Sequence, residues 1–319
     1  MTGTIVDVPG VKVGHAQNEE ALTGCSVILL DKPSVCGVDV RGSAPGTRET
    51  DLLDPLNLVS VVHAICLSGG SAYGLDAATG VMQYLEEKGV GLDVGYGVVP
   101  IVPAAVLFDL AVGDHRVRPD RHMGYQAAAA ATSEAVSEGN VGAGTGASVG
   151  KLNGFANAMK SGLGSASLSL PNGLVIGALV AVNAVGHVME PKTGEILAGP
   201  LDEHREIRDS VDMMLQHAFS PIPPGTNTTI AVVASNAKLT KAGAQKVAQM
   251  AHDGLARTIR PIHTMYDGDT IFSVATGEME AAVDVVGALS ADVLAAAVVN
   301  AVKAAKEAGG LPAYSSFHN

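Results

Sequence analysis

The sequence predicts an α/β protein in which layers of helices and strands form a single domain over residues 1–319. Short apolar runs bounded by turn residues alternate with longer alanine-rich segments that end at glycine, and these patterns are typical of strands and helices. The apolar runs lack the strict alternation of apolar and polar residues that marks a strand with one solvent-exposed face. We therefore expect both faces of their sheet to be covered. A chain of this length can bury such a core.

Four strands are expected along the chain. Residues 25–31 ("CSVILLD") form a short apolar run between turn signals. Residues 173–183 ("GLVIGALVAVN") form a longer run of the same kind, which predicts a buried strand. Two further β-branched runs are expected to be strands, at 229–235 and 270–277.

Five segments are expected to be helices: 56–67, 71–89, 121–139, 240–259 and 290–309. The first two are separated by Ser68-Gly69-Gly70, and the second ends in charged residues followed by Gly89, which is a typical helix end. The alanine-rich third segment also closes at a glycine, Gly139. Prolines cluster in residues 205–227, so this segment is expected to hold the exposed linker of the chain.

Composition excludes several classes of function. The net charge of −12 argues against a nucleic-acid partner, because phosphate binding needs a basic face. Cys25, Cys36 and Cys66 are an odd, widely spaced set, so we expect no disulfide framework or structural zinc site but a reduced, cytoplasmic protein. We expect neither a secretory signal nor a membrane span, because the N-terminal pattern is wrong and polar residues or prolines interrupt the apolar stretches.

The glycine-rich stretch 139–154 is similar to a phosphate-binding loop but does not meet its pattern. Thr145 and Leu152 stand where a Walker A sequence needs glycine and a hydroxyl residue. The stretch fits only the loose dinucleotide pattern, and no acidic residue follows at the required distance, so no nucleotide cofactor is expected. What remains is a glycine-rich loop that carries Lys151, either as a surface lysine or as part of a site.

Two other patterns are weak indications of chemistry. Residues 67–74 approach a nucleophile elbow, but Tyr73 breaks the Gly-x-Ser-x-Gly spacing, and a turn between two helices is the better interpretation. His263, Asp267 and Asp269 could hold a metal ion. Asp-Gly-Asp is more typical of a hairpin turn, so no metal is predicted.

The stretch 225–233 ("GTNTTIAVV") places polar residues directly before an apolar β-branched run. One interpretation is the start of a strand, where Asn and Thr side chains satisfy loose backbone groups after a proline-rich turn. The other is self-cleavage before Thr228, which would give this threonine a free α-amine as its base. A nearby ammonium such as Lys151 would hold the pKa of that amine low, and the buried amide of Asn183 would stabilise an oxyanion.

Seven blocks, in a fixed order along nearly the whole chain, carry a family resemblance: 7–15, 40–55, 63–81, 102–110, 141–151, 225–239 and 263–278. Through them the sequence resembles the DmpA-type family of self-processing aminopeptidases. This family includes L-aminopeptidase D-esterase/amidases, β-aminopeptidases and nylon-oligomer endo-hydrolases. Several independent blocks in order are far more specific than any single motif.

The resemblance implies cleavage of the bond between Asn227 and Thr228, with Thr228 as the nucleophile. The products would be an α chain of residues 1–227 and a β chain of residues 228–319. The family's fold is a four-layer α/β/β/α sandwich like that of N-terminal nucleophile hydrolases, with a different connectivity. Its members usually assemble as oligomers of the cleaved α/β pair, so a homo-oligomer is expected.

The resemblance also implies the other catalytic residues. Lys151 matches the family's lysine in the glycine-rich block, and Asn183 matches its asparagine in the long strand. Asp267 and Asp269 match the pair beside the nucleophile. This Lys/Asp/Asp set resembles that of the nylon-oligomer hydrolases, whereas the DmpA-type aminopeptidase carries Ser and Glu in place of the two aspartates.

One position departs from the family pattern. Some members have a tyrosine that serves as an extra oxyanion donor, and Phe108 stands at that position in this sequence. Phenylalanine cannot donate a hydrogen bond, so Tyr73 or a backbone N–H would have to supply any second donor. Both Phe108 and Tyr73 are expected at the substrate pocket.

These residues predict a self-processing amide hydrolase that uses an N-terminal threonine and needs no metal or cofactor. Aminopeptidase-type activity on short peptides, amides or esters is favoured as the family's commoner role, and an endo-hydrolase of 6-aminohexanoate oligomers is the close alternative. An uncleaved binding scaffold is a different class of function, which Phe108 favours and the presence of Thr228, Lys151 and Asn183 opposes. A transferase of the ornithine acetyltransferase kind is disfavoured, because none of its blocks is present.

Overall fold

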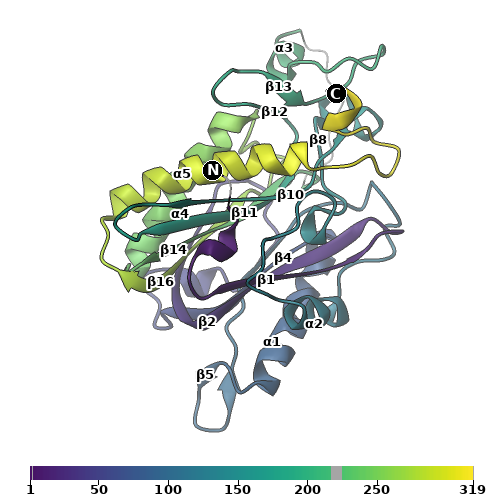
Figure 1. Ribbon diagram of the computed structural model, residues 1–319. Coiled ribbons are helices and arrows are strands. Elements are labelled where there is room, and N and C mark those ends of the chain that lie inside the picture. The colour runs from purple at the N-terminus through teal and green to yellow at the C-terminus, as the bar shows by residue number, and fades with distance from the viewer. Residues whose placement is uncertain (2, 217–224, 319) are drawn as a thin grey trace.

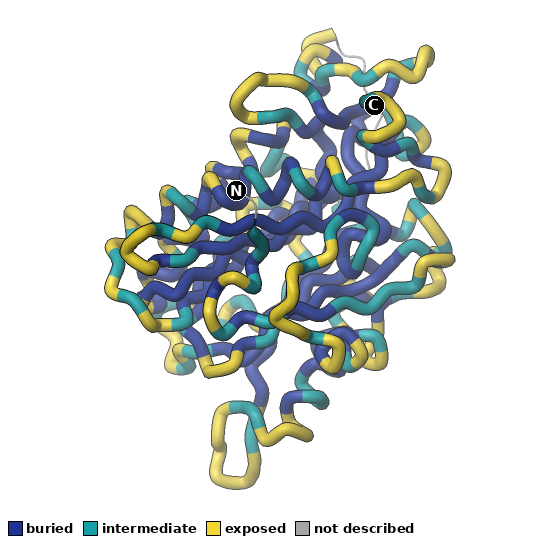
Figure 2. Tube along the Cα trace, in the orientation of Figure 1, coloured by how far each residue is buried: buried dark blue, intermediate teal, exposed yellow. Residues whose placement is uncertain are grey.

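The computed structural model describes residues 1, 3–216 and 225–318. Most strands belong to one hydrogen-bonded sheet that folds over on itself, and helices cover its two outer faces (Figure 1). The strands are buried along most of their length, whereas exposed residues gather in the connecting loops and in the β5–β6 hairpin that projects from the body (Figure 2).

In the described part of the chain the main sheet has nine strands, in the order β10-β11-β14-β16-β2-β4-β7-β3, with β1 paired to β2. The long strand β2 joins its two halves, because its first part pairs with β1 and its last part with β16. A register shift between Leu29 and Ser34 separates these parts. The strands are β1 (Val11–Asn18), β2 (Thr23–Val40), β3 (Thr47–Arg48), β4 (Val61–Ser68), β7 (Ala104–Val106), β10 (Leu163–Ser169), β11 (Val175–Asn183), β14 (Thr228–Ala237) and β16 (Thr270–Met279).

Three buried clusters separate four layers. The first, which includes Val233 and Leu294, lies between the β10–β16 half of the sheet and helices α4 (Lys241–Thr258) and α5 (Val283–Lys303). The second, with Leu67 and Ile230, lies between the two halves of the sheet. The third lies between β2 and β4 on one side and α1 (Ala77–Glu87) and α2 (Arg121–Ala129) on the other. This is the predicted α/β/β/α sandwich, which is confirmed.

The remaining elements are short and connect these layers. The short strands are β5 (Leu92–Asp93), β6 (Val98–Val99), β8 (Ser148–Val149), β9 (Met159–Lys160), β12 (His187–Met189), β13 (Ile196–Ala198) and β15 (Ile259–Arg260). One short α-helix, α3, spans Ser210–Leu215. The 3-10 helices are η1 (Ile5–Asp7), η2 (Asp51–Leu53), η3 (Ser71–Asp76), η4 (Gly142–Gly144), η5 (Lys151–Asn153), η6 (Phe155–Asn157) and η7 (Tyr314–Ser316).

Two of the predicted helices are wrong in type or length. The segment 56–67 is not a helix but contains most of β4, whose β-branched run lies between β2 and β7 in the sheet. The helix predicted over 121–139 ends at Ala129, because the backbone of Thr132 exchanges hydrogen bonds with that of Val13 at 2.9 and 3.0 Å. Alanine content alone therefore overstated the helix, since pairing with another strand outcompeted helix propensity.

Two further boundaries differ from the prediction. The last helix begins at Val283 rather than Ser290 and ends at Lys303, beyond which the side chain of Asn140 pairs with both backbone groups of Lys306. In the segment 205–227, predicted to hold the exposed linker, residues 217–224 lie outside the described part of the chain. Its last two residues, 226 and 227, are buried rather than exposed.

Helix α5 is long and apolar enough to cross a membrane by length and composition alone. In this fold most of it is buried against β10, β11 and α4. Such a helix at the core of a layered protein passes the same test of length and composition.

Candidate active site

The fold brings the predicted catalytic residues to one edge of the main sheet. Thr228 is the first residue of β14 and lies opposite Asn183, the last residue of β11, in their antiparallel pairing. Strands β14 and β16 run parallel, so the loops that precede them reach the same edge. An isolated bridge between Asn227 and Asp267 joins these two loops directly.

The bond between Asn227 and Thr228 is buried and closely surrounded. The two residues are 0% and 3% exposed. The hydroxyl of Thr228 contacts the carbonyl oxygen of Asn227, and the backbone N–H of Gly268 donates to the same oxygen at 3.0 Å. A hydroxyl group, an amide carbonyl and a hydrogen-bond donor for that carbonyl are therefore assembled in one place.

Lys151 is buried beside this bond. Its Nζ donates to Oδ1 and to the carbonyl oxygen of Asn183, at 2.7 and 3.0 Å. Burial lowers the pKa of Lys151 to about 7, although the nearby Asp267 favours the charged form. Gly150 directs this lysine inward through a left-handed turn with φ of 74°, and a Cβ there would lie 2.1 Å from the backbone of Gly199. A neutral amine is therefore available at neutral pH.

Asn183 connects the lysine to two neighbouring loops. Its Oδ1 accepts from Lys151 and from the backbone N–H of Ser148 at 3.0 Å. Its Nδ2 donates to the backbone carbonyl of Phe108 at 2.9 Å. The amide nitrogen carries two hydrogens, of which the Phe108 carbonyl uses one.

Asp267 is a fully buried carboxyl group with unequal surroundings for its two oxygens. Its Oδ2 accepts from the backbone N–H and the hydroxyl of Thr264, at 2.8 and 2.5 Å. Its Oδ1 is buried and has no hydrogen-bond partner among the residues that the structure describes. Burial, followed by the neighbouring Asp269, raises the pKa of Asp267 to about 6.

Asp269 is held from two sides. Its Oδ1 accepts from the backbone N–H of Thr229, the residue directly after Thr228, at 2.7 Å. Its Oδ2 accepts from the backbone N–H of His263 at 3.1 Å and lies 2.9 Å from Nδ1 of the same histidine. His263 adopts a left-handed φ of 59°, a conformation that is uncommon for residues other than glycine and clusters at functional sites.

The loop that carries these aspartates is not the hairpin turn that Asp-Gly-Asp predicted. Strand β15 before it pairs with β12, and β16 after it pairs with β14 and β2, so the loop joins two different sheets. Within residues 1, 3–216 and 225–318, no three His, Cys, Asp or Glu side chains are arranged to hold a metal ion. The orientation of His263 toward Asp269 instead makes it a support for this carboxylate.

A cavity of about 220 Å³ opens beside Thr228. Phe108, which was predicted at the substrate pocket, lines this cavity. Tyr73 is not among its lining residues: this side chain is 62% exposed, and the guanidinium of Arg118 lies 4.1 Å from its ring centre. The lining residues are Ala44, Pro45, Gly46, Ser71, Ala72, Val106, Leu107, Phe108, Gly225 and Thr228.

Comparison with sequence models of protein families shows which family the chain belongs to. The sequence model of peptidase family S58 matches residues 3–313. The chain belongs to peptidase family S58. The predicted resemblance is therefore confirmed, and this S58 peptidase is a hydrolase of amide bonds.

The relatives of the S58 peptidase include proteins named for two activities. An uncharacterized aminopeptidase of Mycobacterium leprae is 44% identical over an alignment that covers 98% of this chain and 93% of the relative. A 6-aminohexanoate-oligomer endohydrolase of a Kocuria species is 34% identical over 278 residues, 86% of this chain and 75% of the relative.

Solved structures share the fold of the S58 peptidase. A β-aminopeptidase of a Burkholderia species gives a TM-score of 0.71 at 22% identity, covering 97% of this chain and 89% of that one. The L-aminopeptidase D-Ala-esterase/amidase of Ochrobactrum anthropi gives 0.73 at 22% identity, covering 98% and 90%. The latter is described as a variant of the N-terminal nucleophile hydrolase fold, in agreement with the predicted fold class.

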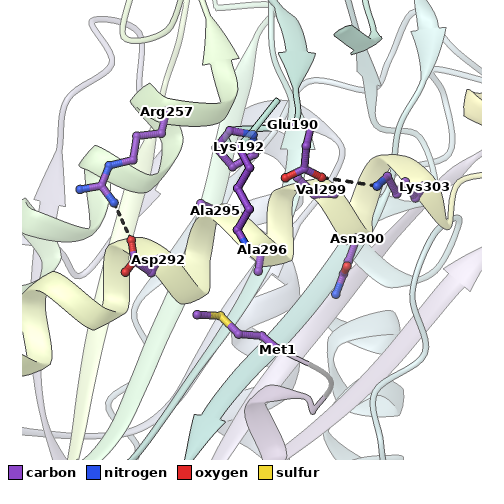
Figure 3. Close-up of a pocket in the computed structure, with 11 residues that line it drawn as sticks. Met1, Glu190, Lys192, Arg257, Asp292, Ala295, Ala296, Val299, Asn300 and Lys303 are labelled. Carbon is purple, nitrogen blue, oxygen red and sulfur yellow. Dashed lines mark hydrogen bonds and ion pairs between the residues drawn. The ribbon is translucent and has the colours of Figure 1, made fainter. Parts of the chain in front are cut away.

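A larger hollow of about 600 Å³ lies over the outer face of α5, away from this site (Figure 3). Its charged residues are largely paired with one another: Arg257 lies 2.6 Å from Asp292, and Lys303 lies 3.5 Å from Glu190. None of the predicted catalytic residues lines it. Of the predicted catalytic residues, Thr228 lines the smaller cavity instead.

Sequence reasoning missed two groups at this site. His263 was considered only as a metal ligand, although its position six residues before Asp269 in one short polar segment was a usable signal. The N–H of Gly268 gave no signal, because any residue except proline supplies a backbone N–H.

Proposed function

We propose that this S58 peptidase cleaves its own chain between Asn227 and Thr228 and then hydrolyses small amides with the freed Thr228. The contact between the Thr228 hydroxyl and the Asn227 carbonyl, both buried, carries this proposal. The products are an α chain of residues 1–227 and a β chain of residues 228–319.

Self-cleavage proceeds in two balanced steps. The Thr228 oxygen bonds to the Asn227 carbonyl carbon, the C–N bond breaks, and the hydroxyl proton ends on the released α-amine. Water then hydrolyses the resulting ester, which gives the Asn227 carboxylate and restores the Thr228 hydroxyl. The neutral fraction of the buried Lys151 provides a group that can accept the hydroxyl proton during the first step.

Turnover of a substrate uses the same nucleophile with a new base. The free α-amine of Thr228, with an ordinary pKa of about 7.7–8.0, takes the hydroxyl proton as Thr228 attacks the substrate carbonyl. The second hydrogen of the Asn183 amide stabilises the oxyanion, and Asp269 fixes the backbone directly after the nucleophile. Asp267 orients the nucleophile or meets a cationic substrate amine. Water finally releases the acid from the acyl-enzyme.

The substrate is proposed to be a short peptide or small amide cleaved in aminopeptidase fashion. Relatives at 44% identity are named aminopeptidases, which supports this choice. The second candidate is endo-hydrolysis of 6-aminohexanoate oligomers, which is supported by the Lys/Asp/Asp set and by the relative at 34% identity. Kinetics on alanyl anilide and on a 6-aminohexanoate trimer, measured side by side, distinguish the two.

Mass spectrometry of the intact protein beside Thr228→Ala tests the proposal. The wild type is expected to split into fragments of about 23 and about 9 kDa by their share of the 32.2 kDa chain, while the variant stays whole. A wild-type chain that remains whole after long incubation would leave Thr228 without a free amine. The proposed mechanism would then be wrong, and an uncleaved binding scaffold would be the better explanation.

We also propose that the cleaved α/β units assemble into a cytoplasmic homo-oligomer. The three free, buried cysteines are compatible with a reducing compartment. Light scattering after size exclusion tests the assembly, and a mass of a single 32.2 kDa unit would contradict it.

A further inference from the structure

The carbonyl that self-cleavage would attack already has a backbone hydrogen-bond donor. The N–H of Gly268 donates to the Asn227 oxygen at 3.0 Å. The other end of the same peptide unit is also held, because the carbonyl of Asp267 accepts from the N–H of Ala44 at 2.9 Å. A peptide group bonded at both ends is fixed in orientation, and its hydrogen bonds strengthen one another.

Asn183, the predicted oxyanion donor, is bonded elsewhere in the uncleaved chain. Its Nδ2 donates to Phe108, and its Oδ1 accepts from Lys151. In the uncleaved chain the donor to the Asn227 carbonyl is therefore the N–H of Gly268 and not the amide of Asn183. The donor for the internal carbonyl thus differs from Asn183, the donor proposed for a substrate.

Residue 268 also has to be small. A Cβ built there would lie 2.9 Å from the Thr228 hydroxyl oxygen and 2.7 Å from the carbonyl oxygen of Ala44. The distance of 2.9 Å shows that residue 268 lies directly against the hydroxyl of Thr228. Glycine therefore allows the close approach that brings its N–H to the carbonyl next to that hydroxyl.

We propose that the backbone N–H of Gly268 is the oxyanion donor of self-cleavage. As the Thr228 oxygen bonds to the Asn227 carbon, negative charge collects on the Asn227 oxygen, and this N–H stabilises it until the C–N bond breaks. Donors of this kind act because they are in place before the charge develops. The inference rests on the proposed self-cleavage and adds the group that accelerates it.

Replacing this single N–H by oxygen tests the proposal. Glycolic acid introduced at position 268 by nonsense suppression converts the 267–268 amide into an ester, which has no N–H and adds no side-chain atom. The control places glycolic acid at Gly173, whose N–H makes an ordinary turn hydrogen bond to Leu170 at 2.9 Å. The readout is the rate of appearance of the 228–319 fragment, with thermal unfolding as a check on folding.

The ester at 268 is expected to slow self-cleavage about 10²-fold or more, as loss of one oxyanion donor does elsewhere, while the ester at 173 leaves the rate within about twofold. Equal rates for both esters, with the wild type cleaving normally, would overturn the role of Gly268. A wild type that never cleaves would instead overturn the underlying proposal of self-processing, so the two failures are distinct.

A second measurement covers the case in which the 268 ester does not fold. In uncleaved Thr228→Ala protein labelled with ¹⁵N-glycine, the Gly268 amide is expected to exchange with solvent at least 10²-fold more slowly than in cleaved wild type. The reason is that cleavage removes Asn227 as a fixed partner. Equal exchange in the two proteins would contradict a specific bond from Gly268 to the scissile carbonyl.

Discussion

Lys151 is expected to lower the free energy of unfolding of the protein. Its Nζ is fully buried, and burial favours the neutral amine. Lys151→Met keeps most of the side-chain volume and removes the charge. Because self-cleavage would change the unfolding reaction, the comparison belongs in the uncleaved background, between Thr228→Ala and the double variant Lys151→Met with Thr228→Ala.

The pKa of Lys151 sets the size of the effect. Between its ordinary value of 10.5 and about 7, at 1.36 kcal/mol for each pH unit, burial of this lysine costs about 5 kcal/mol at pH 6. Methionine loses two hydrogen bonds to Asn183, worth about 1 kcal/mol each. The methionine variant is therefore expected to be more stable by about 3 kcal/mol at pH 6.

The sign of the pH dependence follows from the proton count. Between pH 7 and 10.5 the unfolded chain keeps the lysine proton that the folded chain has released, so the stability of the lysine form rises with pH. The advantage of methionine is expected to fall to about zero by pH 9. Urea unfolding at pH 6, 7.5 and 9 measures both proteins. A stability difference that does not change with pH would refute a lowered pKa at Lys151.

Three further changes test the surroundings of the nucleophile. Asn183→Ala is expected to lower kcat on an alanyl anilide about 10²–10³-fold in matured protein, and an unchanged kcat would contradict its role as oxyanion donor. His263→Leu removes a charge-assisted hydrogen bond to Asp269 and is expected to slow self-cleavage about 10-fold or more, as followed on denaturing gels. His263→Asn is expected to slow it less, because asparagine tolerates the left-handed φ. Gly150→Ala is expected to lower the Tm by about 3 °C or more. It is also expected to prevent self-cleavage, because it displaces Lys151, and normal self-cleavage in this variant would refute that expectation.

Local patterns predicted the elements whose apolar runs are long and whose ends carry turn residues. The strands at 173–183 and 229–235 and the helix at 240–259 are present within a few residues of their predicted bounds. The helix predicted over 56–67 was wrong because a continuous apolar run suits a buried strand and a buried helix equally. Its partners in the sheet decide between the two, and these lie far away in the sequence.

The geometry of the site depended still more on distant contacts. The sequence resemblance named Thr228, Asn183 and Lys151, but their proximity arises from the register in which Asn183 faces Thr228 across two strands. Register depends on which residues of both strands must face the core and on the turns that join them, so the sequence of one strand alone does not fix it. The left-handed conformation of His263 likewise could not be predicted from the local sequence, because only a few per cent of residues other than glycine adopt it.

The unusual composition of the chain has a direct consequence at this site. With 38 glycines and few aromatic residues, the chain can bring backbone against backbone where larger side chains would separate them. Gly42 shows this beside Gly268: a Cβ at Gly42 would lie 2.3 Å from the N–H nitrogen of Asp269. Backbone N–H groups held this closely are fixed donors that need no side-chain ordering when charge develops.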